Sequence, residues 1–141
     1  MIELHHINIS PDNIDASVDF YRNVLGFGTL AGADQLNSAR VLDQGYSGRA
    51  EFLDLGSAQL HANDRDLNVA FKTGQSINPI ANGHIAFRTD DLEGIKQRLE
   101  ERGIPYADFG QWAIDGWHQI FLNDPNGTVI EVHEVTGEGA P

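Results

Sequence analysis

Histidine and carboxylate side chains are the groups most capable of chemistry in this chain, which has six histidines and no cysteine. Glu131 is notable among them, because it interrupts a β-prone run and shares one strand face with Val129 and His133. A carboxylate in the middle of an apolar strand costs free energy unless a positive charge meets it. The position of Glu131 therefore predicts a charged partner.

An internal repeat indicates where that partner comes from. The pattern His-Ile-x-Ile-x-x-Asp-x-Ile of residues 6–14 recurs as His-Ile-x-Phe-x-x-Asp-x-Leu in residues 84–92, at a constant offset of 78. Each half of the chain reads as a strand, a helix and three further strands. His6 and His84 are therefore equivalent residues at the start of the two halves.

The last strands of the two halves carry a second pair of residues. His61 follows its hairpin glycine by five residues, and Glu131 follows its own by four. A pseudo-twofold axis relating the halves would bring this pair and the two first-strand histidines together on the concave face of a curved sheet. Three histidines and one glutamate, without cysteine, suit Zn, Ni, Mn, Fe or Co. We expect one divalent metal ion with the ligands His6, His61, His84 and Glu131.

Hydrophobic periodicity predicts the elements that hold these residues. Residues 31–48 receive no assignment beyond a loop or an edge segment. Residues 63–82 read as a linker with a short helix, or as a mobile loop over a site. Helices are expected from Asp12 or Asn13 to Gly26 and from Asp90 or Asp91 to Gly103, and strands at 3–9, 27–30, 50–55, 59–62, 83–87, 104–109 and on both sides of the turn at 124–127.

These elements predict an α+β fold in which two βαβββ modules form an intramolecular repeat. Their curved mixed sheet is expected to surround a metal cleft. At 141 residues the chain is expected to be a single domain, 1–141. Its parts are module one (1–65), a linker (66–81), module two (82–135) and a tail (136–141).

Composition argues against several classes of partner. The chain carries 21 Asp+Glu against 9 Lys+Arg, and the net charge of −12 disfavours nucleic acid and anionic membranes. No apolar run approaches the length of a membrane span, and the first residues open a strand pattern instead of a leader sequence. We expect a cytoplasmic protein that acts on a small molecule.

The chain also resembles the vicinal-oxygen-chelate superfamily, which includes glyoxalase I, bleomycin-resistance proteins, extradiol dioxygenases, methylmalonyl-CoA epimerase and fosfomycin-resistance enzymes. The resemblance spans residues 3–134. It is carried by His6-Ile7, Phe20-Tyr21-x-x-Val24-Leu25-Gly26-Phe27, Gly83-His84-Ile85-Ala86-Phe87, and Asp124-Pro125-Asn126-Gly127 continuing to Glu131.

The resemblance implies that His6, His84 and Glu131 bind the metal, because they match the family's first-strand His, fifth-strand His and last-strand Glu. The family's fourth-strand position is His61 in this chain, where glyoxalase I and the epimerase usually have Glu or Gln. In glyoxalase I that carboxylate also shuttles the substrate proton. His61 is therefore either a ligand or a base.

The favoured function implied by the resemblance is a metal-dependent, glyoxalase-like lyase or isomerase. In such an enzyme the metal binds vicinal oxygens of a small substrate and stabilises an enediolate. Glu131 or His61 would move the proton. Many relatives dimerise, and we expect a homodimer here.

Two other functions stay open. His6, His84 and Glu131 also form the two-histidine, one-carboxylate triad that holds Fe(II) in non-haem oxygenases. An extradiol-type dioxygenase is thus the alternative, although Phe121 stands where the dioxygenase signature has Tyr. A small-molecule binding protein of the bleomycin-resistance type is the third, although those members usually lack the metal ligands. Fosfomycin-type activity fits less well, since Asn8 replaces the family's first-strand Thr.

The remaining polar and aromatic residues are assigned by strand parity. His133 shares a face with Glu131 and could support or replace a ligand, but its position near the strand end favours a surface role. His5 and His118 have the opposite parity to the site and are expected to be structural or exposed. The residues expected to bind substrate in the cleft are Asn8, Trp117, Gln119 and Phe121.

Overall fold

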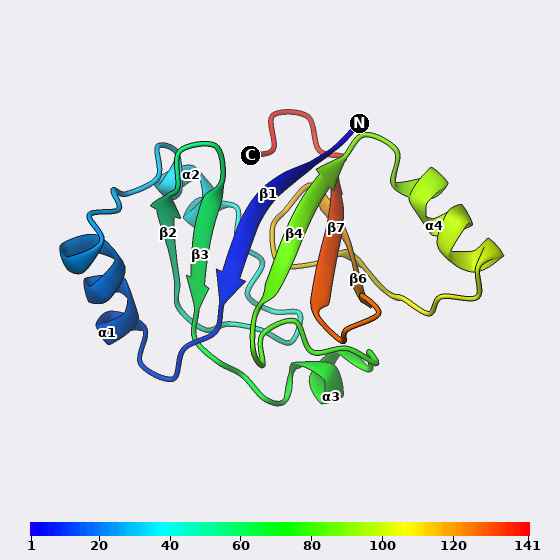
Figure 1. Ribbon diagram of the computed structural model, residues 1–141, viewed down its shortest axis with the longest axis horizontal. Helices are drawn as coiled ribbons and strands as arrows, with labels where there is room; N and C mark the ends of the chain where they lie inside the picture. Colours follow the sequence, from blue (N-terminus) through cyan, green and yellow to red (C-terminus); the bar gives the residue numbers. More distant parts are fainter.

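One curved, unclosed seven-stranded sheet organises the computed structural model, which describes residues 1–141 (Figure 1). The strand order is β2-β3-β1-β4-β7-β6-β5, so the first strands of the two halves are neighbours at the centre. This arrangement confirms the predicted α+β class. The strands are β1 (Ile2–Ile9), β2 (Ala50–Asp54), β3 (Gln59–Asn63), β4 (His84–Thr89), β5 (Ala107–Gln111), β6 (Trp117–Asn123) and β7 (Val129–Val135).

The helices are short and lie around the sheet. In Figure 1, α1 lies beyond the β2–β3 end of the sheet and α4 lies beyond the opposite end. None of the helices combines the length and apolar character that a membrane crossing needs. They are α1 (Ile14–Asp19), the π-helical turn η1 (Phe20–Val24) that continues it, α2 (Ala33–Ser38), α3 (Val69–Thr73) and α4 (Leu92–Glu101).

Strand pairing displays the internal repeat. In the first half β1 pairs in parallel with β3, which pairs antiparallel with β2. In the second half β4 pairs in parallel with β7, which pairs antiparallel with β6. β1 and β4 pair antiparallel and join the halves. The two modules therefore form one continuous sheet with a pseudo-twofold relation at its centre.

The first half lacks one expected strand. Residues 27–30 form only the isolated bridge between Thr29 and Leu53, although Leu30 N also donates to the Phe52 carbonyl at 3.1 Å. This segment occupies the place that β5 occupies in the second half. It is too short for a ladder because Gly28 offers no side chain to pack and α2 begins a few residues later.

Two segments without a firm prediction also take defined structure. The unassigned stretch 31–48 contains α2 and a second isolated bridge, between Arg40 and Ile114. The linker contains α3, as one of its two interpretations predicted. The first segment packs against both β2 and β6, and Val69 of α3 lies in one core cluster with Phe121 of β6, so both segments reach the site described below.

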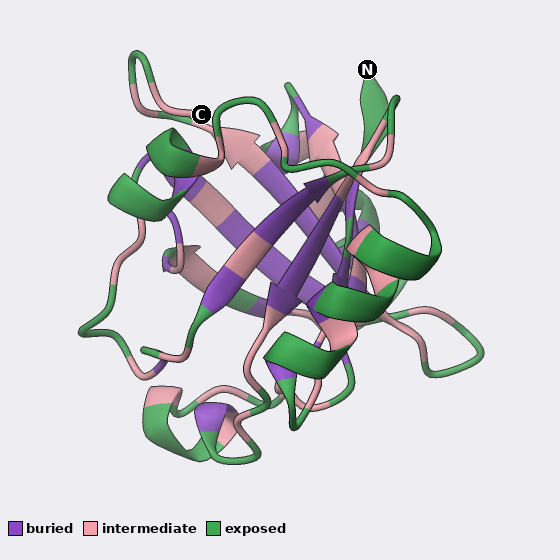
Figure 2. Ribbon diagram, turned by 90° about the vertical axis from the view of Figure 1, so that its left-hand side faces the viewer, coloured by how far each residue is buried: buried purple, intermediate pink, exposed green.

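Two helices, α1 and α4, pack on the face of the sheet opposite to His61 and Glu131. Ile14 and Val18 of α1 pack against Ala62 of β3. Leu92 and Leu99 of α4 pack in the same way with Ile120 and Val132. Figure 2 shows buried residues along the central strands, whereas the helices expose their outer surfaces. The opposite, inner face of the sheet carries the rest of the hydrophobic core and the buried polar residues.

Gly83 fixes the close approach of β4 to β1 and provides a test of this register. Its φ is +90°, and a Cβ there would collide with the backbone carbonyl oxygen of Asn8. Gly83→Ala is expected to lower the free energy of unfolding by about 2–4 kcal/mol, because steric overlap adds to left-handed strain. The matched control is Gly127→Ala, with φ +85° and no atom within 4 Å, which adds strain alone and should cost about 1 kcal/mol. Equal losses in urea unfolding would contradict the assigned close contact.

Candidate metal centre

Two adjacent rows of the sheet carry the candidate ligands. In the first row Asn8 of β1 pairs with both His61 of β3 and His84 of β4. Because side chains alternate along a strand, these three lie on one face. The row places a histidine from each half on either side of Asn8.

The second row lies two residues further along. His6 of β1 pairs with Ala86 of β4, and Ala86 pairs with Glu131 of β7. Ala86 is the equivalent of Asn8 in the repeat, so Glu131 and His61 occupy matching positions, as the repeat predicted. The small side chain of Ala86 leaves space between His6 and Glu131.

His6, His84 and Glu131 form a compact group at the junction of these rows. One ligand atom from each lies within 4.8 Å of the other two, and all three side chains are buried. His6 Nε2 is 3.4 Å from Glu131 Oε2, and His84 Nε2 is 3.9 Å from Glu131 Oε1. This group could hold a metal ion with two nitrogen donors and one carboxylate.

Hydrogen bonds at Nδ1 of His84 and of His6 orient the Nε2 atom of each ring. His84 Nδ1 lies 2.9 Å from the Pro79 carbonyl oxygen, which can only accept, so Nδ1 carries the proton and Nε2 keeps its lone pair. His6 Nδ1 lies 2.8 Å from His5 Nδ1, so one of these rings donates to the other. Donation by His6 leaves its Nε2 lone pair directed to the group.

The carboxylate is held in its charged form. Gln119 donates to Oε1 at 2.7 Å and His133 donates to Oε2 at 3.0 Å. Burial alone would raise the pKa of Glu131, but the hydrogen bond from His133, the electrostatic interactions with His133 and His84 and the hydrogen bond from Gln119 lower it to about 2. Each oxygen retains a lone pair, so the donor set fits a divalent cation.

The histidines of the site are held neutral. Burial, reinforced by the neighbouring His61 and His84, brings the pKa of His6 well below its ordinary value. Burial likewise lowers the pKa of His84 and of His61. Neutral imidazole is the form that binds metal, so these rings are ready as ligands or as proton acceptors.

His61 lies beside the group and not within it. Its ring stacks on His6 with centroids 3.8 Å apart, and its Nε2 is 2.7 Å from Gln59 Oε1. It belongs instead to a second cluster with His5 and His6. The structure therefore brings His6, His84 and Glu131 together, whereas the fourth predicted ligand, His61, is separated from Glu131 and His84 by the ring of His6.

His133 is completely buried, so the expected surface role is wrong. Its ring stacks on Trp117 at 4.2 Å, and Arg88 Nε donates to its Nε2 at 2.9 Å. Arg88 in turn donates to the Pro141 carbonyl, so the last residues fold back over this strand end. His133 is thereby a hydrogen-bonded support of Glu131.

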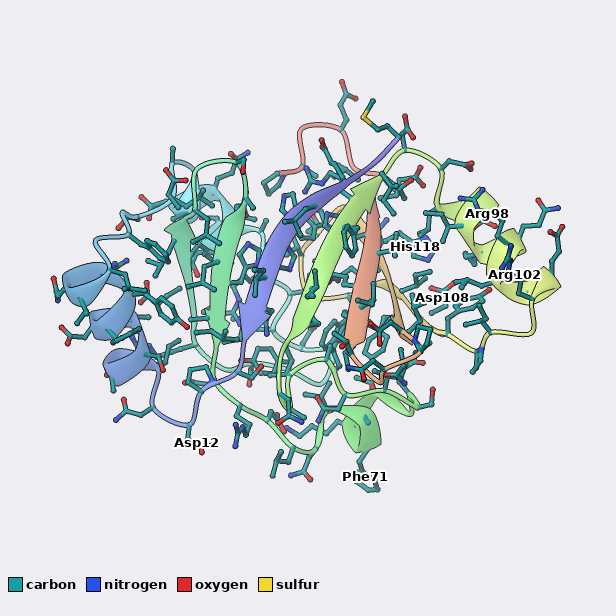
Figure 3. The ribbon with its side chains drawn as sticks, viewed as in Figure 1. Asp12, Phe71, Arg98, Arg102, Asp108 and His118 are labelled. Atoms are coloured by element: carbon teal, nitrogen blue, oxygen red, sulfur yellow. The ribbon has the colours of Figure 1, made fainter.

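The ring of His5 also lies on the opposite face of the sheet from the one that strand alternation predicts. A register shift between Leu4 and His6 makes His5 the extra residue of a β-bulge. Its ring consequently lies 5.1 Å from His6 and 4.9 Å from His133, on the same side as the site. His118, by contrast, lies outside the site and its Nε2 is 2.7 Å from Asp108 Oδ1 (Figure 3).

A cavity of about 50 Å³ opens beside the group. Its lining contains all four residues expected in the cleft, namely Asn8, Trp117, Gln119 and Phe121. It also contains residues that the sequence did not single out, because they come from segments without periodicity. These are Arg40, Tyr46 and Trp112, among others.

Comparison with known proteins agrees with this architecture. A family model described as the Glyoxalase/Bleomycin resistance protein/Dioxygenase superfamily matches residues 3–132. The chain belongs to this superfamily. Glyoxylase I 4 of Arabidopsis thaliana is 29% identical over 136 residues, which make up 94% of this chain and 70% of that protein.

Two solved structures have folds similar to that of this chain. Methylmalonyl-CoA epimerase from Mycobacterium tuberculosis has a TM-score of 0.65 at 19% identity, over 96% of this chain and 89% of that one. A hypothetical protein from Bacillus halodurans C-125 has a TM-score of 0.65 at 20% identity, over 94% of both chains. At these identities the likeness shows the fold alone, and function is argued from the site.

The support from His133 leads to a prediction about metal affinity. His133→Phe keeps the stacking ring but removes the hydrogen bond to Glu131, and it is expected to weaken metal binding about 10- to 100-fold. His118→Phe is the matched control and should leave the affinity unchanged, because His118 bonds only Asp108. Chelator-competition titration with Zn²⁺ or Ni²⁺ measures both. Equal affinities for the His133 variant and the wild type would refute the supporting role.

Proposed function

We propose that this protein is a metal-dependent, glyoxalase-like lyase or isomerase that acts on a small substrate through two neighbouring oxygens. The observation that carries the proposal is the buried group of His6, His84 and Glu131, drawn from both halves of the repeat. Relatives named glyoxylase I 4 and methylmalonyl-CoA epimerase support the same class.

His6, His84 and Glu131 would hold the metal, and His61 is the candidate for a fourth ligand or for the base. When bound, a divalent ion would supply Lewis-acid polarisation of a substrate carbonyl. The protein's part is to keep both histidines neutral, with free nitrogens, and to keep the carboxylate charged. The hydrogen bonds to Pro79, Gln119 and His133 do this.

His61 is better suited than Glu131 to move a proton. Both oxygens of Glu131 already accept hydrogen bonds, and their remaining lone pairs would be taken by the metal ion. His61 is neutral, and with Nε2 donating to Gln59 its Nδ1 keeps a lone pair. Burial disfavours the charged ring, so a proton that His61 accepts beside a carbonyl is readily returned. Taking and returning a proton is the work of an isomerase base.

The cavity wall restricts what reaches this base. Phe121 and Trp117 have almost no exposed surface, and both line the cavity with Phe52. The Nε1–H of Trp117 is buried and has no acceptor in the protein, so it is available to a substrate oxygen. A space of about 50 Å³ admits the reacting end of a substrate and little water.

Oxygen activation is the second candidate, favoured by one observation. The compact group contains two histidines and one carboxylate without His61, which is the ligand set of non-haem Fe(II) oxygenases. Iron in the purified protein, together with oxygen consumption in the presence of a catechol, would favour this candidate over the isomerase.

Metal analysis of single variants tests the proposal. His6→Ala, His84→Ala and Glu131→Ala should each lose most of the metal, whereas His61→Ala should retain it and lose at least about 100-fold in kcat. The assays are elemental analysis per chain and turnover of the methylglyoxal–glutathione hemithioacetal and of methylmalonyl-CoA. His118→Ala is the control for a histidine outside the site.

Two results would overturn this assignment. Wild-type metal content in any of the three ligand variants would show that the ion binds elsewhere. Loss of metal in His61→Ala would make His61 a ligand, and the base would have to be another residue.

A further inference from the structure

One cationic residue is among those that line the cavity beside the metal group. Arg40 is the only lysine or arginine among the residues that line it. Its backbone is fixed, because residues 39–41 pair with residues 113–115 through the Arg40–Ile114 bridge. Val41 N donates to the Ala113 carbonyl at 2.9 Å and Asp115 N donates to the Ala39 carbonyl at 2.8 Å.

Contacts with Gly48 and Tyr46 hold the guanidinium of Arg40 in place. Its Nη2 donates to the Gly48 carbonyl at 2.5 Å, and its Cζ lies 6.0 Å from the centre of the Tyr46 ring. Tyr46 is buried and donates to the Asp64 carbonyl at 2.6 Å. A Cβ at Gly48 would lie 2.5 Å from the Tyr46 hydroxyl oxygen, so a residue with a side chain would disturb this arrangement.

Arg40 has no carboxylate partner, although the chain is strongly acidic. The carboxylate of nearby Asp64 accepts a hydrogen bond from Arg49 N at 3.0 Å and makes no ion pair with Arg40. A half-buried guanidinium loses part of its hydration, which an anion would restore. Most other basic side chains do have a carboxylate within ion-pair distance: Arg22, Arg49, Arg65, Lys72 and Lys96.

One side chain links this cation to the metal group. The Gln119 carbonyl oxygen accepts from Ala113 N at 2.9 Å, and its amide donates to Glu131. Ala113 belongs to the segment that pairs with Arg40. The spacing between the cation and the ligand group is therefore fixed by continuous hydrogen bonds.

We propose that Arg40 binds a carboxylate of the substrate, so that the substrate carries two neighbouring oxygens at one end and a carboxylate at the other. Four of the five guanidinium N–H donors remain after the hydrogen bond to Gly48. Two of them can donate to the two oxygens of a planar carboxylate. The small cavity favours a carboxylate over the bulkier phosphate. This inference rests on the proposed function, because the metal group defines the reacting end.

The test compares 2-oxo acids that differ only at the far end. The pairs are oxaloacetate with 2-oxobutanoate, 2-oxoglutarate with 2-oxopentanoate, and 2-oxoadipate with 2-oxohexanoate, so the span need not be known. Calorimetric titration of the metal-loaded full chain should show at least one dicarboxylate binding about 10- to 100-fold tighter than its partner. Arg40→Gln should abolish that preference and leave monocarboxylate affinity unchanged.

Two further variants sharpen the comparison. Arg40→Lys keeps the charge without the planar fork and should retain only part of the preference. Arg98→Gln removes an exposed charge on α4, on the outside of the molecule (Figure 3), and should keep all of it. This control separates the local contact from a change in net charge.

Three outcomes would overturn the inference. One is equal affinity for all three pairs in the wild type. Another is an equal loss for both members of a pair in Arg40→Gln, which would indicate a structural role at Gly48. The third is an unchanged preference in that variant. Metal content is measured on the same samples, so a chain without metal reports failure of the proposed function separately.

Discussion

A buried, ionised carboxylate is the constraint on which the rest of this structure depends. Glu131 is only 1% exposed, on the strand beside the central pair β1 and β4, where an uncompensated charge would cost several kcal/mol. Its two direct hydrogen-bond donors, Gln119 and His133, satisfy part of its capacity. The nearby His6 and His84 are kept neutral and cannot supply a full countercharge. A divalent cation would complete the charge balance, which is the physical argument for a metal centre at this group.

The supports of that carboxylate extend through both halves of the fold. On one side Arg88 of β4 fixes His133, and the Pro141 carbonyl accepts from Arg88. On the other side the backbone of Ala113 fixes Gln119. His6 comes from β1, so binding of an ion would join the two modules across their central strand pair. Such binding would stabilise the folded chain as well as prepare the site, because unfolding separates the ligands.

The convergence of the candidate ligand residues was predictable, because it depends on two local regularities. Alternation along a strand fixes which face His6, His84 and Glu131 occupy, and the repeat aligns the two halves without any knowledge of the loops. The strand register confirms that His61 is equivalent to Glu131. Those regularities say which backbone positions converge. They do not determine the side-chain conformation, and the His61 ring stacks on His6 instead of joining the group.

The residues that were missed depend on contacts far apart in the sequence. A one-residue bulge carries His5 to the site face, and contacts with Trp117 and Arg88 bury His133, although neither leaves a local pattern. Arg40 lies in a segment without periodicity and acquires its position from residues 113–115. The metal group thus belongs to the regular sheet, whereas the cation that would select the substrate belongs to an irregular segment held by few backbone bonds. Changes in that segment can alter the ligand and leave the metal group intact, which is how one scaffold supports many reactions.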